Sequence, residues 1–201
     1  MTYVIDCRKN WEMPERLLAD ETDPVRRRNL ETIIDHGKAE AKPDFEALMA
    51  TVAPNAKYTS YTEGGGDNSP TGKDGVAAYY RGIVGSGCNH IEHAIERMSV
   101  GRDVITTEGD MKMAYPGKVL AAMGVPVPDE DAHYLYLSRL MIVWGFDDDG
   151  LVTCEDSYAA GGYPGFEGIA ERPVTMDQIY PWADDPASRG RSRRAPATVS
   201  D

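Results

Sequence analysis

The stretch MIVWGFDDDGLVTCEDSYAAGG, residues 141–162, decides the fold, because it reads as two strands joined by an Asp-rich turn that ends in Gly. Strands over 133–146 and 151–160 are therefore expected to form a long antiparallel hairpin. The second strand runs directly into two adjacent carboxylates, Glu155 and Asp156. Charged residues are rarely buried, so this pair marks a candidate functional position.

A second hairpin is predicted from 90–100 and 104–115, where apolar and polar residues alternate. Helical signals lie upstream of it. Asp23 followed by Pro24 is typical of a helix start, and Asp44 is a second N-cap candidate. The sequence predicts helices over 23–42, 44–53 and 74–85, and a first strand over 56–62.

Helices near the N-terminus followed by hairpins indicate an α+β fold. We expect a cone-shaped curved antiparallel sheet, packed by three N-terminal helices around a central pocket that could take a small ligand. Residues 1–22 are expected to be an N-terminal arm, 23–162 the domain, and 163–201 a C-terminal strap and disordered tail. The Pro- and Gly-rich connection 116–132 is typical of a lid or binding loop.

Composition narrows the class of protein. Hydrophobic residues make up 41% and charged residues 27%, as in a soluble globular protein. No apolar run approaches the ~18–20 residues of a membrane span, and no signal peptide is visible, which favours a cytoplasmic protein. The net charge of -12 disfavours nucleic acid as a partner. Cys7, Cys88 and Cys154 form no CxxC pair, which disfavours disulfides and a Cys-built zinc site.

Three segments in order, PDFEALMATVAPNAKYTSY (43–61), TGKDGVAAYYRGIV (71–84) and VWGFDDDGLVTCEDSY (143–158), resemble the nuclear transport factor 2-like superfamily, most closely its SnoaL-like enzyme branch. The resemblance covers roughly residues 25–160. It implies a cone-shaped barrel, a homodimer or higher homo-oligomer, and no cofactor or metal in most members. Members include dehydratases, isomerases, epoxide hydrolases, cyclases and non-catalytic binding proteins, so the fold does not name the function.

The resemblance also shows departures. The ketosteroid-isomerase branch carries an Asp on the first strand, where this chain has Thr59, Ser60 and Tyr61. The dehydratase branch carries an Asp just before the second helix, where only Glu40 could substitute. That branch also places a His at the start of the second strand, where this chain has His90 and His93.

His93 and Asp156 are the candidate catalytic residues. His93 shares the apolar face of its strand with Ile91 and Ile95, so it is expected to face the pocket and act as a base. Alternation from Val152 and Cys154 predicts that Asp156 faces the same pocket, where it would orient His93 or act as an acid, and that Glu155 faces away. A hydrogen-bonded core histidine and an Asp156 bonded to backbone or Arg139 remain the alternatives.

Further residues are candidates for substrate contact. The tyrosines offer apolar walls with a hydroxyl donor, and the others are charged or imidazole groups near the expected pocket. His36 is expected at the surface. The candidates for substrate contact are Tyr58, Tyr61, Tyr80, Glu108, Tyr136, Arg139, Tyr158, His90 and His133.

These residues favour a cofactor-independent lyase or dehydratase that acts on a small hydrophobic hydroxylated molecule, such as an aromatic catabolite. Elimination needs one proton removed and one leaving oxygen protonated, with no redox group. An isomerase is an alternative, as is an epoxide hydrolase built on Asp156, Arg139 and Glu108. A ligand-binding module without catalysis is the third reading.

Overall fold

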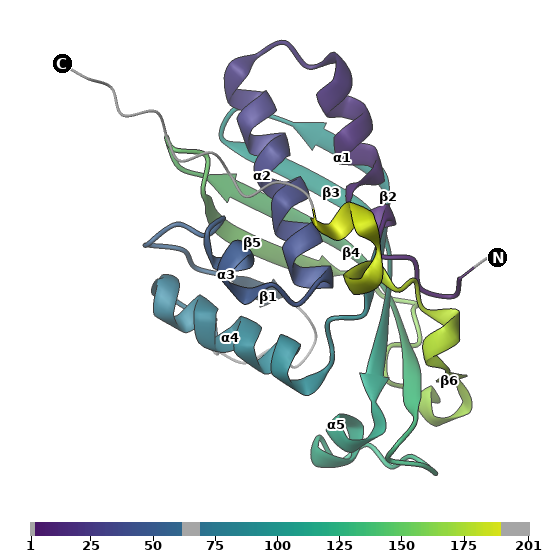
Figure 1. Ribbon diagram of the computed structural model, residues 1–201. Helices are drawn as coiled ribbons and strands as arrows, with labels where there is room; N and C mark the ends of the chain where they lie inside the picture. The colour runs from purple at the N-terminus through teal and green to yellow at the C-terminus, as the bar shows by residue number, and fades with distance from the viewer. Residues whose placement is uncertain (1–2, 62–68, 190–201) are drawn as a thin grey trace.

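The computed structural model describes residues 3–61 and 69–189, and its helices include the three that the sequence predicts, each beginning within two residues of the expected start. The Asp23 side chain accepts hydrogen bonds from the backbone N–H groups of Val25 and Arg26, and Asp44 accepts one from Ala47, so both predicted N-caps are confirmed. The helices are α1 (Lys9–Asp20), α2 (Pro24–Ala41), α3 (Phe45–Met49), α4 (Gly72–Ser86) and α5 (Gly117–Ala122) (Figure 1).

The sheet contains both predicted hairpins and confirms the α+β class. Its strands are β1 (Thr59–Tyr61), β2 (Ile91–Val100), β3 (Val104–Pro116), β4 (His133–Phe146), β5 (Val152–Ala159) and β6 (Pro173–Val174). Their order is β1-β5-β4-β3-β2, and β6 pairs with β4. One expectation needs correction: β1 runs parallel to β5, so the sheet is mixed rather than wholly antiparallel.

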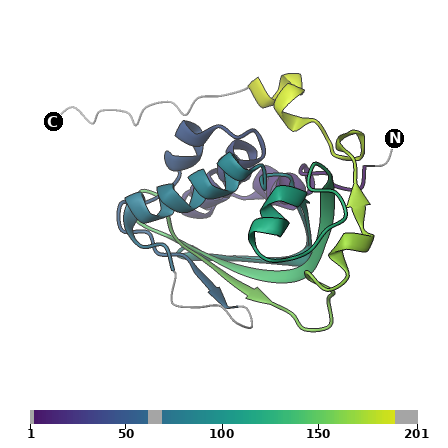
Figure 2. The same ribbon diagram turned by 90° about the horizontal axis from the view of Figure 1, so that it is seen from below.

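The sheet bends where β2 and β3 meet at Gly109. The register of β2 shifts between Ile95 and Arg97, and a Cβ on Gly109 would lie only 2.0 Å from the carbonyl oxygen of Ala94. Only a residue without a side chain allows this approach, and irregular pairing of this kind increases local bending. Figure 2 shows the sheet curving around the side on which α3 and α4 lie.

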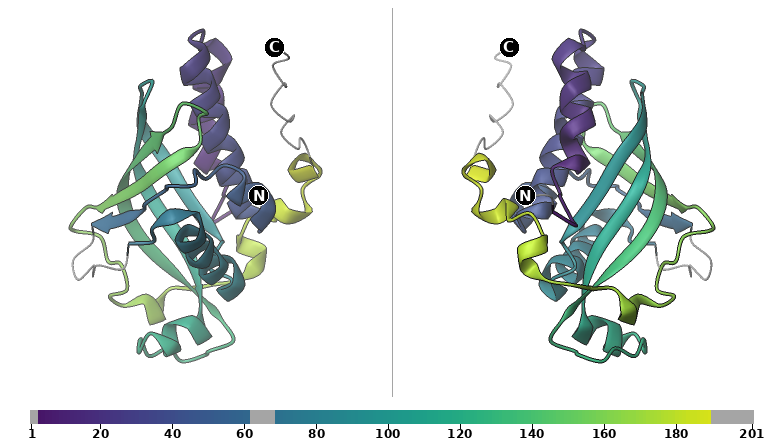
Figure 3. Two further views of the ribbon diagram at one scale, coloured as in Figure 1. Left: turned by 90° about the vertical axis from the view of Figure 1, so that its left-hand side faces the viewer. Right: turned by 90° about the vertical axis from the view of Figure 1, so that its right-hand side faces the viewer.

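The core lies between the helices and the concave face of the sheet. Leu30 and Ile33 of α2 pack against Ile105 of β3. Farther along, Leu48 from α3 belongs to a second cluster with Val152 of β5. Figure 3 shows α1 and α2 side by side next to the long strands. The helices therefore lie on one face of the sheet, and the described chain ends lie on the same side.

The segment after β5 runs back along the domain as short 3₁₀ helices and β6. Trp182 is buried against Trp11 of α1, with ring centroids 4.8 Å apart, and Ile179 pairs with Ile5. In the 116–132 connection, Leu120 of α5 is fully buried in a side cluster. The expected disordered tail lies mostly in 190–201, outside the described residues. No helix within 3–61 and 69–189 is long and apolar enough to cross a membrane.

Candidate functional site

Glu155, in the last third of the hairpin, points toward the helices because β5 contains a bulge. Pairing advances by one residue on β4 but by two on β5 between Val152 and Cys154, so Thr153 is the extra residue. A Cβ on Gly145 of β4 would lie 2.8 Å from both the Cys154 Sγ and the Thr153 Oγ1, so Gly145 makes room for the bulge. An extra residue moves every following side chain to the other face. Val152 and Glu155 therefore share the inner face.

The prediction that Asp156 faces the pocket is wrong for the same reason. Asp156 pairs with Val143 of β4 and Thr59 of β1, and lies on the face opposite to Glu155. Its Oδ1 atom has no hydrogen-bond partner among the described residues. Tyr61 and Tyr158 share this outer face, where their exposed rings stack with centroids 4.5 Å apart.

On the inner face, Glu155 ends a chain of buried hydrogen bonds. Its Oε2 lies 2.7 Å from the Tyr80 hydroxyl, which also lies 2.7 Å from Nε2 of His36. Nδ1 of His36 lies 2.7 Å from Oγ1 of Thr51. His36, Tyr80 and Thr51 are each 1% exposed. The chain therefore joins α2, the end of α3, α4 and β5 inside the domain.

The expected surface position of His36 is thus wrong. Its ring lies between those of Tyr80 and Trp144, with centroid separations of 5.5 and 5.4 Å. Burial lowers the pKa of His36 to about 3, so the imidazole is neutral at physiological pH. A neutral imidazole donates one hydrogen bond and accepts another, so His36 can donate to one of its partners, Thr51 or Tyr80, and accept from the other.

Glu40, one helical turn after His36, supplies a second carboxyl. Burial raises the pKa of Glu40 to about 7, and burial together with the nearby Glu40 charge raises the pKa of Glu155 to about 8. Repulsion between the two carboxylates opposes ionisation of both, so the pair holds one proton near neutral pH. A buried pair that shares a proton can supply an acid and a base together.

Tyrosines border this carboxyl pair. The hydroxyl of Tyr58 is next to that of Tyr80, yet has no partner at hydrogen-bond distance among the described residues. Tyr58 is 4% exposed. Tyr79 is 45% exposed, and its ring contacts those of Tyr58 and Tyr80. The Glu155 side chain keeps 21% exposure. The site therefore has a dry inner end and an open outer side.

His93 lies apart from this site. It is 5% exposed and pairs with Met111 on the face of β3 that also carries Thr107, so its predicted inward orientation is confirmed. Its Nε2 has no hydrogen-bond partner, so the predicted contact with Asp156 is absent from the described part of the chain. Burial lowers the pKa of His93 to about 4, which makes it a weaker base than expected.

Arg139 and Glu108 meet, but not in the trio expected for an epoxide hydrolase. Arg139 donates to Glu108 at 3.0 Å, to Asp110 at 2.8 Å and to Glu96 at 2.8 Å. None of these hydrogen bonds includes Asp156, which lies on another strand. The arrangement is a cluster of ion pairs around Arg139.

The remaining candidates lie near the start of β2 and β4. The rings of His90 and His133 meet edge to face, with centroids 6.3 Å apart. Tyr136 packs against Tyr115 and Phe166. Among the described residues, none of the three candidates takes part in the contacts of Glu155 with Tyr80 and His36, so the structure does not bring them to the same site.

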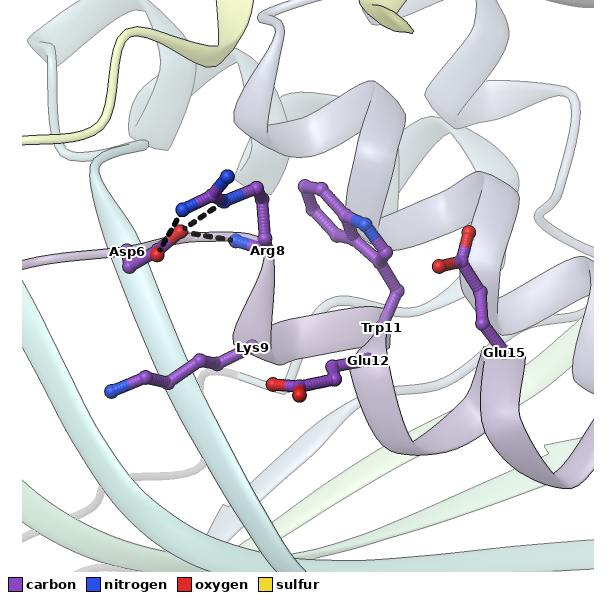
Figure 4. Close-up of a pocket in the computed structure, with 6 residues that line it drawn as sticks. All are labelled: Asp6, Arg8, Lys9, Trp11, Glu12 and Glu15. Atoms are coloured by element: carbon purple, nitrogen blue, oxygen red, sulfur yellow. Dashed lines mark hydrogen bonds and ion pairs between the residues drawn. The ribbon is translucent and has the colours of Figure 1, made fainter.

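A recess of about 450 Å³ lies along α1, lined by Asp6, Arg8, Lys9, Trp11, Glu12 and Glu15 (Figure 4). Its charged groups are largely paired. Arg8 bonds Asp6, Lys9 reaches Glu92, and Glu15 binds Lys38. These ion pairs therefore neutralise most of the charge that lines the recess.

Sequence reasoning missed His36, Thr51 and Glu155. The spacing of His36 and Glu40 by four residues places both on one face of a helix, which is the signal that could have found them. For Glu155 the signal is Gly145, which lies opposite Cys154 and makes room for the extra residue Thr153, and a single sequence does not reveal this as a bulge.

Comparison with known proteins adds a family and a fold. A family model described as a SnoaL-like domain matches residues 34–155. No curated protein matches the chain. Among solved structures, a protein assigned as a SnoaL-like polyketide cyclase from Shewanella putrefaciens CN-32 is 12% identical, with 73% of this chain and 86% of that chain covered and a TM-score of 0.55.

Two further structures have similar folds. An LEH-like epoxide hydrolase from M. tuberculosis is 16% identical, with 72% of this chain and 91% of that chain covered and a TM-score of 0.53. A protein with a ketosteroid isomerase-like fold from Catenulispora acidiphila DSM 44928, in complex with trimethylamine, is 12% identical, with coverages of 71% and 94% and a TM-score of 0.51. At these identities the likeness concerns the fold alone, and it confirms the predicted architecture.

Proposed function

The chain belongs to the SnoaL-like domain family, and on that premise we propose that it is a cofactor-independent lyase that dehydrates a small apolar molecule carrying a hydroxyl group. The observation that carries this proposal is the inward carboxyl pair, Glu155 and Glu40, whose pKa values are both raised toward neutrality. Dehydration requires one group that gives a proton and one that takes a proton. A pair that shares one proton meets both needs.

Glu155 has the higher pKa and is assigned the role of acid, and Glu40 that of base. Glu40 takes a proton from a carbon next to a carbonyl group, and the electron pair of that C–H bond forms the new double bond. The C–O bond to the hydroxyl group breaks as Glu155 protonates the leaving oxygen, which departs as water. The two carboxyls have then exchanged protonation states, and proton exchange with solvent restores them.

Tyr58 and Tyr79 suit a substrate that is apolar and oxygenated. The unpartnered Tyr58 hydroxyl would donate to the substrate carbonyl, where negative charge develops as the proton leaves. The exposed Tyr79 ring, which contacts Tyr58 and Tyr80, would pack against an aromatic or aliphatic group. Such a surface favours a hydroxylated aromatic ketone over a sugar or a phosphate.

The proposal is tested with 4-hydroxy-4-phenylbutan-2-one as the probe. Its dehydration gives a conjugated ketone that absorbs strongly in the ultraviolet. We expect the wild-type protein to accelerate this reaction and Glu155→Gln to reduce the rate by about 100-fold or more, since the amide cannot protonate the leaving oxygen. Asp156→Asn is the matched control, because that carboxyl is adjacent in sequence but faces away, and its rate should stay within about twofold of wild type.

Two outcomes would overturn the proposal. Equal rates for Glu155→Gln and wild type would remove Glu155 from the chemistry. The second outcome is measured by NMR in D₂O. If the probe exchanges hydrogen for deuterium without losing water, the site transfers protons as an isomerase does and is not a dehydratase. Backbone NMR spectra of each variant establish that the fold is retained.

A further inference from the structure

Four consecutive hydrogen bonds run from a backbone carbonyl to Glu155. Oγ1 of Thr51 lies 2.7 Å from the Leu48 carbonyl oxygen and 2.7 Å from Nδ1 of His36. Nε2 of His36 lies 2.7 Å from the Tyr80 hydroxyl, which lies 2.7 Å from Oε2 of Glu155. Because a carbonyl oxygen can only accept, the direction of the first bond is fixed whenever that bond is made.

Counting protons gives the arrangement when Glu155 is protonated. The four bonds need four protons: one each from the Thr51 hydroxyl, the neutral His36 ring, the Tyr80 hydroxyl and the Glu155 carboxyl. Thr51 donates to Leu48, so His36 must donate to Thr51 from Nδ1. Tyr80 then donates to Nε2, and the Glu155 carboxyl donates to the Tyr80 oxygen. Every bond is made and every donor is used.

Ionisation of Glu155 leaves three protons for the same four bonds. A carboxylate only accepts, and a charge-assisted bond from Tyr80 is the strongest that the chain can offer it. If Tyr80 donates to Glu155, its oxygen can bind Nε2 of His36 only as an acceptor. Nε2 must then carry the ring proton, since otherwise two buried lone pairs would face each other at 2.7 Å. Nδ1 then becomes an acceptor, and the Thr51 hydroxyl turns from Leu48 to Nδ1. The bond to Leu48 is the one that is lost.

We infer that His36 and Thr51 are positioning residues that couple the ionisation of Glu155 to the tautomer of His36, Nδ1–H with the acid and Nε2–H with the carboxylate. This inference deepens the proposed function, since it concerns the proton of the group assigned as the acid. The acid form makes one hydrogen bond more than the carboxylate form. Thr51 therefore helps Glu155 to keep its proton until a substrate takes it.

An imidazolium at His36 with a Glu155 carboxylate would also fill all four bonds. Burial disfavours it, because the apolar surroundings lower the pKa of His36. The other titratable groups around Glu155 include Glu40 on α2, the hydroxyls of Tyr58 and Tyr79, and its β5 neighbours Cys154 and Asp156. Each is negative or neutral, so repulsion from these groups also favours the protonated form of Glu155.

The test is NMR spectroscopy of the substrate-free protein labelled with ¹⁵N and ¹³C. Two-bond ¹H–¹⁵N spectra distinguish the two tautomers and the imidazolium, and the ¹³C shift of the Glu155 carboxyl reports its ionisation. The chain has four histidines, so His36→Gln assigns the signal. Between about pH 6 and about pH 9.5 we expect His36 to change from Nδ1–H to Nε2–H as Glu155 ionises.

Variants separate coupling from simple packing. In Glu155→Gln the amide donates to Tyr80 as the acid does, so His36 should remain Nδ1–H at every pH. Tyr80→Phe should uncouple the tautomer from the Glu155 titration. Thr51→Val should lower the pKa of Glu155 by about half a unit to one unit, because the acid form loses its extra bond, whereas Thr51→Ser should leave the pKa unchanged.

An unchanged His36 tautomer in the wild type while Glu155 ionises would overturn the inference, as would an imidazolium at the start of the titration. If Tyr80→Phe does not fold, Glu155→Gln decides the question alone. No substrate enters the experiment. The tautomer change can therefore be present in a protein that fails to dehydrate the probe, and the two proposals fail separately.

Discussion

The Tyr80 hydroxyl lies 2.7 Å from the Glu155 carboxyl, joining the inner face of α4 to the inner face of β5. Of the two adjacent carboxylates, Glu155 therefore points into the domain and Asp156 points out of it. It also links Glu155, through Tyr80, to the neutral His36 ring. The acid–base character of the site therefore depends on a strand bulge and on three elements distant in sequence.

The proposed roles predict a bell-shaped pH dependence for probe dehydration. Activity requires Glu40 ionised and Glu155 protonated, so kcat/KM should fall as pH drops below the raised pKa of Glu40, about 7, and as it climbs past that of Glu155, about 8. Initial rates measured between about pH 5 and about pH 10 provide the profile. Glu155→Asp, which keeps a titratable group, should retain a bell shape, and a flat wild-type profile would contradict the assignment.

Folding stability should depend on Glu155 in a defined direction. Its pKa is raised from 4.5 to about 8 in the folded chain, so the folded state binds more protons than the unfolded state between these values. Its contribution to the free energy of unfolding is thus complete below about pH 4.5 and lost as pH rises through about 8. The difference in free energy of unfolding between wild type and Glu155→Gln should therefore decrease by roughly 4 kcal/mol from pH 5 to pH 9.

Urea unfolding followed by tryptophan fluorescence measures this difference. His36→Gln provides a contrast with the opposite sign. The pKa of His36 is lowered to about 3, so its contribution is present above 6.5 and is lost as the solution is acidified. Parallel pH curves for wild type and Glu155→Gln would show that Glu155 titrates normally.

Much of the fold could be predicted from local signals. Asp23 and Asp44 cap their helices through bonds to residues only two or three positions away. The hairpins follow from alternation and from turn residues that lie within a short stretch. Such signals depend on few residues, so a single sequence contains them.

The site could not be predicted, because it depends on one irregular position and on contacts across the chain. In an uninterrupted strand, side chains alternate between the two faces, so Val152 and Asp156 would share a face. The extra residue Thr153 reverses the alternation, and Asp156 lies on the opposite face. The meeting of His36 with Tyr80 joins residues 44 positions apart. Nothing near either residue in the sequence specifies that pairing.

Gly109 should be intolerant of any side chain. The Cβ of Gly109→Ala would lie 2.0 Å from the Ala94 carbonyl oxygen, a backbone atom that cannot turn aside. We expect a loss of about 3 kcal/mol or more in the free energy of unfolding. Gly82→Ala, on α4 where a Cβ meets nothing within 4 Å, should instead gain roughly 0.5–1 kcal/mol. Equal stabilities in urea for the two variants would mean that the sheet does not bend tightly at Gly109.

Glu92 anchors the N-terminal arm to β2. Its carboxylate is 1% exposed, with Oε1 2.9 Å from Nζ of Lys9 and 3.1 Å from Nζ of Lys112, and Oε2 accepts from the backbone N–H of Asp6 at 2.6 Å. Glu92→Ala should destabilise the fold by roughly 3 kcal/mol, because it leaves two cations and a backbone donor without their acceptor. Amide hydrogen exchange at Asp6 should also become faster.

A fully exposed ion pair provides the control for Glu92. Asp131 and Lys118 are 82% and 72% exposed, so Asp131→Ala should leave the urea midpoint unchanged, since water and salt screen such pairs. Glu92→Gln separates charge from hydrogen bonding, because the amide oxygen can still accept from Asp6 while the attraction to both lysines is lost. Protection at Asp6 in Glu92→Gln but not in Glu92→Ala would show that the acceptor holds the arm, and loss in both would assign that role to the charge.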